Sequence, residues 1–158
     1  MAIGFIKLGN VHYYLDEAQN NLGNLVTGWK KINGSWYYFS PTPAQNKEKG
    51  YMMTGWYGNY YFYGSGKMAT GFINLNGSYY YLDESNTSSV GLRKTGWQKI
   101  QGSWYYFAKP GEAQYTGLMT KGWKQIGGVW YYFYSNGKMA CNTTIDGYRL
   151  NASGAWVK

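Results

Sequence analysis

The sequence predicts an all-β fold, a solenoid of stacked β-hairpins, from three observations. First, 33 aromatic residues outnumber the 21 Leu, Ile and Val residues of this 158-residue chain, and 23 glycines interrupt it. Tyr, Trp and Phe favour strands, whereas frequent glycine disfavours helices. Second, a Gly-aromatic pair followed by Tyr-Tyr-aromatic or Tyr-Tyr-Leu recurs six times. Third, a turn dipeptide separates the two halves of most of these units. Because a lone hairpin is only marginally stable in water, each hairpin must bury one face against the next.

The six units follow a regular order along the chain. They begin at the glycines Gly4, Gly28, Gly55, Gly71, Gly96 and Gly122. Glycines three units apart are separated by 67 or 68 residues, which indicates an internal duplication. We therefore predict a single module over residues 1–158. It contains a three-hairpin block over 1–70, a duplicated block over 71–141 and a degenerate C-terminal cap over 142–158.

The second unit shows why each unit should be a hairpin. Residues 29–32 carry Trp and Lys on one face of a strand and Lys and Ile on the other. Asn33-Gly34 suits a two-residue type I′ turn, and Ser35–Phe39 has the composition of a strand. The same turn position is held elsewhere by Asn76-Gly77, Gln101-Gly102 and Gly127-Gly128. This turn would place Lys31 opposite Trp36 and Trp29 opposite Tyr38. Ile32, Tyr37 and Phe39 would then share the other face, which is the better core face.

Charge and cysteine content exclude several classes of protein. The net charge of +8 favours a polyanionic partner, but the basic residues are scattered singly, which argues against a nucleic-acid or membrane-binding arm. No segment approaches the roughly 20 apolar residues of a membrane helix, so the chain is not expected to be transmembrane. The single cysteine, Cys141, excludes a disulfide framework and a cysteine zinc site. We expect neither a metal nor a cofactor.

The face of each hairpin that carries the tryptophans has large aromatic rings at positions where an aliphatic core would not need them. Rings around a gap can hold a quaternary ammonium, which has no N–H group to satisfy, at about 0.5–2 kcal/mol per ring. The flat faces of sugars can also stack on such rings. A third interpretation is that the rings only hold neighbouring hairpins together. The pattern of aromatic residues alone does not decide between a cation site, a sugar site and a purely structural role.

Two phrases of the sequence resemble the choline-binding repeat of Gram-positive surface proteins. They are Gly-Tyr-Met-Met-Thr-Gly-Trp over residues 50–56 and Gly-Trp-Lys-Lys-Ile-Asn-Gly-Ser-Trp-Tyr-Tyr-Phe over residues 28–39. The resemblance covers nearly the whole chain. It implies a left-handed superhelix of hairpins that binds the phosphocholine of cell-wall teichoic and lipoteichoic acids. The ligand pocket is expected between consecutive hairpins.

The resemblance also implies which residues form these pockets. Two complete sets of three rings and a methionine are expected, namely Trp36, Tyr38, Trp56 and Met52, and Trp104, Tyr106, Trp123 and Met119. Two less complete sets are Tyr79, Tyr81 and Trp97, and His12, Tyr14 and Trp29. In the former of these, Arg93 stands where the methionine is expected.

Enzymatic activity is not expected from this sequence. The adjacent carboxylates Asp16-Glu17 and Asp83-Glu84 take the same place at a hairpin end, which fits a turn better than a general acid/base pair. The predicted function is therefore non-catalytic attachment of a secreted protein to the bacterial cell wall. The long polar segments, such as residues 40–49, are candidate surfaces for adhesion, regulation or a protein partner, and self-association is open. The alternative function is glucan binding.

Overall fold

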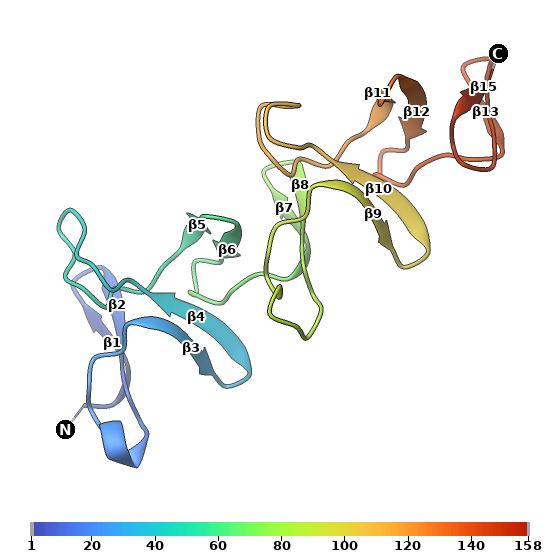
Figure 1. Cartoon of the computed structure of the whole chain (residues 1–158). Coiled ribbons are helices and arrows are strands. Elements are labelled where there is room, and N and C mark those ends of the chain that lie inside the picture. Colours follow the sequence, from blue (N-terminus) through green and yellow to red (C-terminus); the bar gives the residue numbers. More distant parts are fainter. Residues whose placement is uncertain (1, 158) are drawn as a thin grey trace. The chain divides into compact units, whose positions relative to one another are not determined.

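The computed structural model describes residues 2–157 and is built of β-hairpins, which confirms the predicted all-β class (Figure 1). Within this range there is no α-helix, and Gln19–Asn21 forms a single 3-10 turn. The chain divides into two compact units, one ending at Ala69 and the other beginning at Thr70.

The first unit contains three antiparallel hairpins. Their strands are β1 (Gly4–Leu8) with β2 (Val11–Leu15), β3 (Gly28–Ile32) with β4 (Ser35–Phe39), and β5 (Gly55–Tyr57) with β6 (Tyr60–Phe62). The third hairpin is shorter than the other two because its strands have three residues each.

The second unit contains three further hairpins and a small sheet. The hairpins are β7 (Gly71–Leu75) with β8 (Ser78–Leu82), β9 (Gly96–Ile100) with β10 (Ser103–Phe107), and β11 (Gly122–Ile126) with β12 (Val129–Phe133). The sheet has the order β13 (Thr143–Ile145), β14 (Tyr148–Leu150), β15 (Trp156–Val157). The segment predicted as a degenerate cap is thus a hairpin with one added strand.

The turns fix the register of these hairpins as the sequence predicted. Asn33 and Gly34 have φ angles of 46° and 80°, so both central residues are left-handed, as a type I′ turn requires. Lys31 lies opposite Trp36, and Trp29 lies opposite Tyr38. Gln101 and Gly102, with φ angles of 47° and 80°, give β9 and β10 the equivalent register.

The core consists of the other face of each hairpin. Ile32, Tyr37 and Phe39 are all buried, which confirms the predicted core face. The last residue of most second strands is completely enclosed, as in Phe39, Phe62, Leu82, Phe107 and Phe133. Rings of consecutive hairpins meet here, because Phe5 of β1 lies 5.2 Å from Tyr37 of β4. Aromatic contacts between hairpins therefore replace an aliphatic core.

Backbone hydrogen bonds also join hairpins that are neighbours in the sequence. After a hairpin ends, a methionine N–H donates to a carbonyl of the hairpin before it. In the first unit Met52 donates to His12 at 2.7 Å and Met68 to Trp36 at 2.8 Å. In the second unit Met119 donates to Tyr79 and Met139 to Trp104, both at 2.8 Å. These bonds fix each hairpin against its predecessor.

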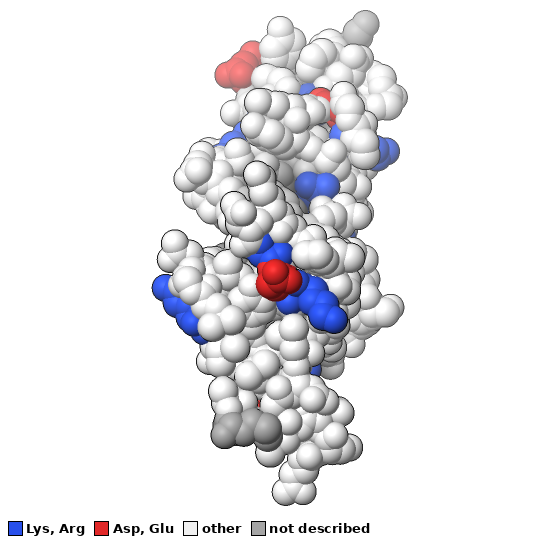
Figure 2. Space-filling view, turned by 90° about the vertical axis from the view of Figure 1, so that its left-hand side faces the viewer, with Lys and Arg blue, Asp and Glu red and all other residues white. Residues whose placement is uncertain are grey.

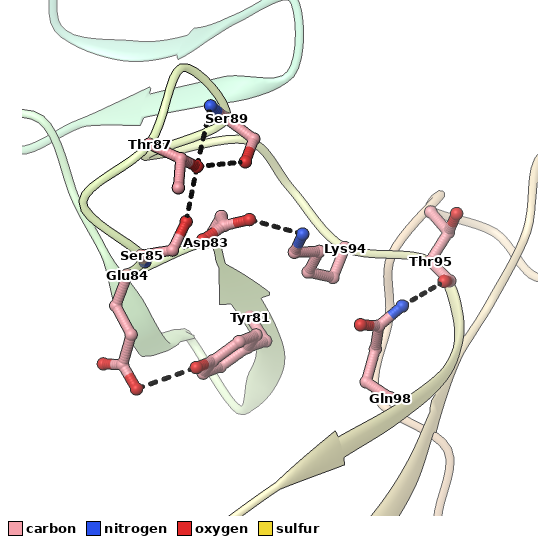
Figure 3. Close-up of polar contacts among 9 residues, drawn as sticks. All are labelled: Tyr81, Asp83, Glu84, Ser85, Thr87, Ser89, Lys94, Thr95 and Gln98. Carbon is pink, nitrogen blue, oxygen red and sulfur yellow. Dashed lines mark hydrogen bonds and ion pairs between the residues drawn. The ribbon is translucent and has the colours of Figure 1, made fainter.

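The carboxylates that follow β2 and β8 organise turns, as predicted. Figure 3 shows the second of them, Asp83. Asp83 Oδ1 accepts the Ser85 N–H at 2.7 Å, and its other oxygen pairs with Lys94. Asp16 likewise accepts the Ala18 N–H and pairs with Lys30 at 2.8 Å. The lysine in each pair lowers the pKa of the aspartate. Each aspartate is therefore engaged as an ionised acceptor of its turn.

Replacing Asp83 with asparagine should destabilise the protein and weaken its acid sensitivity. The Asp83 carboxyl stays ionised in the folded chain at a pH at which the unfolded chain, with a pKa near 3.8, takes up a proton. Its contribution is therefore present above about pH 4 and is lost as the pH falls towards the lowered pKa. We expect a loss of about 1–2 kcal/mol at pH 7, discounted for partial exposure of Lys94.

Urea unfolding at pH 7 and at pH 3 measures this effect. The difference between the two variants should shrink at the lower pH. Glu48→Gln, an exposed loop carboxylate, is the matched control for removing one negative charge. The stabilising role of Asp83 is contradicted if Asp83→Asn and Glu48→Gln lower the free energy of unfolding equally. It is also contradicted if the loss caused by Asp83→Asn is the same at pH 7 and at pH 3.

Candidate functional site

An aromatic cage lies on the outer face of the first unit. Trp29 of β3 and Trp36 of β4 have ring centroids 6.3 Å apart and planes nearly perpendicular, at 88°. Tyr60 of the next hairpin lies 4.8 Å from Trp29. The backbone N–H of Met68 donates to the Trp36 carbonyl, as the N–H of Met139 does to the Trp104 carbonyl in the second unit. We call this set of Trp29, Trp36, Tyr60 and Met68 cage A.

The second unit repeats this arrangement. Trp97 and Trp104 lie 6.2 Å apart at 89°, and Tyr131 lies 4.9 Å from Trp97. With Met139 these residues line an open cavity of about 390 Å³. We call this set of Trp97, Trp104, Tyr131 and Met139 cage B. The duplicated sequence thus produces the same geometry twice.

A third cage involves the C-terminal sheet. Trp123, Trp130, Tyr148 and Trp156 line a cavity of about 330 Å³ and form cage C. Tyr148 lies 5.6 Å from Trp123 and 5.5 Å from Trp156. Trp156 stands where cages A and B have a methionine. One polar contact reaches this cage, because Trp123 Nε1 donates to Asp146 at 3.2 Å.

A lysine ammonium group lies over one tryptophan of cage A and of cage B. Lys31 Nζ is 5.9 Å from the ring of Trp36, and Lys99 Nζ is 6.0 Å from the ring of Trp104. The residues that line the cavities of cages B and C include no carboxylate. On the face drawn in Figure 2, Lys and Arg form separate small groups on a largely uncharged surface, and the central group lies beside an acidic side chain. The cages are therefore mainly ring surfaces, suited to a poorly hydrated group.

The structure groups the two complete predicted sets differently. Tyr106 is only 1% exposed, and its hydroxyl donates to Glu112 at 2.8–2.9 Å. Burial, together with this hydrogen bond, raises the pKa of Tyr106 to about 12. Tyr38 is buried and stacks on Tyr57 at 4.6 Å. Both tyrosines are therefore buried, and each lies against a cage tryptophan, Tyr38 at 5.1 Å from Trp29 and Tyr106 at 5.3 Å from Trp97.

The other predicted members of these sets are also separated. Met52 and Met119 are buried in the cores of their units. Trp56 packs edge-on against Tyr61, and Trp123 lines cage C. Only Trp36 and Trp104 are walls of the cages to which they were assigned. The physical reason is the hairpin register, which sets the tryptophans of both strands of one hairpin diagonally across from each other.

The two less complete predicted sets are regrouped as well. Trp29 and Trp97 are main walls of cages A and B. Tyr14 and Tyr81 are buried, and burial raises the pKa of each to about 12, with a contribution from Glu17 and Glu84, respectively. The backbone of His12 accepts the Met52 N–H. Tyr79 already faces a cation, because Lys121 Nζ lies 4.4 Å from its ring.

Sequence reasoning did not assign several residues of the cages. They are Tyr60, Met68, Tyr131, Met139, Trp130, Tyr148 and Trp156. The phrase Gly-Lys-Met, which follows both Phe62 and Phe133, is a signal that could have identified the two methionines. No comparable signal marks Trp156, because the C-terminal segment departs from the repeat.

Among residues 2–157, no three His, Cys, Asp or Glu side chains form a group that could hold a metal ion. Cys141 is exposed and has a free thiol. Over the same residues, no helix has the length and apolar character needed to span a membrane.

The chain is similar to known repeat families and to solved structures. The choline-binding repeat family matches residues 118–156, and the putative cell wall binding repeat family matches residues 27–42, 70–85 and 95–112. The structure of CbpJ from Streptococcus pneumoniae TIGR4 is 38% identical with a TM-score of 0.80, over 99% of this chain and 48% of that chain. Choline binding protein F from Streptococcus pneumoniae is 36% identical with a TM-score of 0.58, over 99% of this chain and 58% of that chain.

The chain thus spans about half the length of these two proteins. A comparison with curated protein sequences gives no match.

Proposed function

Because this chain belongs to the choline-binding repeat proteins, we propose that cages A, B and C bind choline or phosphocholine and thereby attach the protein to cell-wall teichoic and lipoteichoic acids. The observation that supports this proposal most is the repeated right-angled pair of tryptophans with a tyrosine beside it. Several ring faces then surround one point, and each contributes about 0.5–2 kcal/mol towards a desolvated cation. A trimethylammonium group suits such a site because it needs no hydrogen-bond acceptor.

The repetition of the cages suits a repetitive polymer. A single cage is a weak site, but cages A, B and C on one chain raise the effective concentration of the next choline once the first is bound. The net charge of +8 attracts the phosphates of the polymer over a distance that salt shortens. Attachment to the wall should therefore weaken with ionic strength more than the binding of free choline does.

The wider biological role follows from this attachment. We place the protein outside the bacterial cell as a non-catalytic wall-binding module. The loop of residues 40–49 is exposed apart from the buried Ser40 and offers a surface for adhesion or regulation. These roles depend on wall attachment and do not compete with it.

Titration with choline, followed by tryptophan fluorescence and isothermal titration calorimetry, tests the proposal. We expect saturable binding and retention on a trimethylammonium resin that free choline elutes. Ethanolamine, which carries N–H groups and is better hydrated, should compete poorly and is the matched ligand control. Absence of saturable binding together with retention on dextran would replace choline binding with the glucan-binding alternative.

A further inference from the structure

We propose that Lys31 and Lys99 bind the phosphate of phosphocholine at the rims of cages A and B, so that these two cages prefer phosphocholine to choline. This inference rests on the proposed function, because it assumes that the cages hold the trimethylammonium group. Lys31 and Lys99 then have a role of their own, phosphate binding, which is separate from the binding of the ammonium group by the aromatic walls.

The hairpin register places both lysines at equivalent positions. Lys31 is paired directly with Trp36 across β3 and β4, and Lys99 is paired with Trp104 across β9 and β10. Their ammonium groups lie 5.9 Å and 6.0 Å from the centres of those rings. Both lysines are exposed. Lys99 is not among the residues that line the cavity of cage B, so it lies beside the wall rather than inside the cage.

These lysines carry charge that the fold leaves uncompensated. The ion pairs found among residues 2–157 join Lys30 to Asp16 and Lys94 to Asp83. Lys30 precedes Lys31 but points to the opposite face, where it is paired with Tyr37 across the hairpin. The cationic group nearest to the outer rings of cage A therefore remains free to meet an anion.

A lysine beside a cation site is unfavourable unless the ligand also carries negative charge. Two like charges repel each other, and the repulsion is only partly screened at a surface. In phosphocholine, two methylene groups and an ester oxygen separate the nitrogen from the phosphorus. With the ammonium inside the cage, the phosphate reaches the rim, where a lysine can donate a charge-assisted hydrogen bond. The same lysine thus opposes choline and favours phosphocholine.

Cage C provides an internal comparison. The residue paired with Trp130 is Gln125, at the position that Lys31 and Lys99 hold in the other hairpins. Its side-chain amide donates to the Gly128 carbonyl at 3.2 Å. Cage C therefore combines three tryptophans and a tyrosine without a rim lysine. We expect cage C to discriminate less between the two ligands.

Calorimetric titration with choline and with phosphocholine tests the inference in the intact chain. The measured quantity is the ratio of the phosphocholine affinity to the choline affinity. It is determined at low salt for the wild type and for the double variant Lys31→Gln/Lys99→Gln. An exposed charge pair contributes about 0.2–1 kcal/mol, so the phosphocholine preference should fall by a factor of about 1.4 to 5. Choline affinity should be unchanged or higher, because a repulsive charge is removed.

Two further variants sharpen the test. Gln125→Lys should increase the phosphocholine preference of cage C, whereas Lys49→Gln/Lys109→Gln removes two loop charges and should leave the ratio unchanged. An unchanged ratio in Lys31→Gln/Lys99→Gln, or an equal loss of affinity for both ligands, overturns the inference while choline binding itself stands. Failure of the wild type to bind either ligand overturns the proposed function instead.

Discussion

Replacement of Trp104 with alanine is expected to remove one choline equivalent from the titration of this protein. Trp104 is 41% exposed and forms one wall of cage B at a right angle to Trp97. Loss of one ring face costs about 0.5–2 kcal/mol, or roughly two- to thirty-fold in affinity, which suffices to take a weak site out of the measurable range. Calorimetric stoichiometry at fixed salt is the measurement. The melting temperature should change little because the ring is half exposed.

Matched variants separate this effect from a general loss of aromatic surface. Trp36→Ala should remove one equivalent in the same way, because cage A has the same geometry. Tyr115→Ala removes a ring that is 52% exposed and belongs to none of the three cages, so it should leave the stoichiometry unchanged. If Trp36→Ala and Trp104→Ala both keep the wild-type number of choline equivalents, the cages are assigned incorrectly.

The structure of one hairpin could be predicted from its sequence because the controlling interactions are local. A type I′ turn at Asn33-Gly34 sets the pairing of Lys31 with Trp36, and strict alternation then separates Trp36 from the core residue Tyr37. Neither step needs information from another hairpin. The division of side chains between the two faces of a hairpin follows from these two rules alone, whereas the burial of Tyr38 and Tyr106 on the outer face depends on neighbouring segments.

The composition of the cages could not be predicted in the same way because it depends on how hairpins stack. The third ring of cage B is Tyr131, which comes from the following hairpin, and its position is set by contacts across the core. Met119 was predicted as a cage wall, but its side chain packs against Gly137. The contact is so close that a β-carbon at Gly137 would collide with the Met119 sulfur. The contact buries this methionine beneath the next turn of chain instead of leaving it as a cage wall. Trp156 has no precedent in the repeat and takes the place of a methionine only once β15 pairs with β14.

Truncation of Phe107 to alanine should have the largest effect on stability of the variants considered. Phe107 is fully buried and lies 6.2 Å from Tyr81, 6.3 Å from Tyr105 and 6.3 Å from Phe72. It therefore joins two consecutive hairpins, β7–β8 and β9–β10. Removal of a buried phenylalanine ring costs about 3–5 kcal/mol, because the surrounding rings cannot close the cavity. The free energy of unfolding in urea measures the loss.

A control variant and a measurement with choline test whether the loss in Phe107→Ala comes from the aromatic core. Phe72→Ala removes the same ring from a position that is 43% exposed, so it should cost clearly less than Phe107→Ala. Saturating choline stabilises the folded state by mass action and should raise the melting temperature of Phe107→Ala as it does for the wild type, provided the cages still form. Equal losses for Phe72→Ala and Phe107→Ala would mean that the buried ring stacks are not what holds the hairpins together. In that case the backbone hydrogen bonds of Met119 and Met139 to the preceding hairpins would be the main interactions that hold consecutive hairpins together.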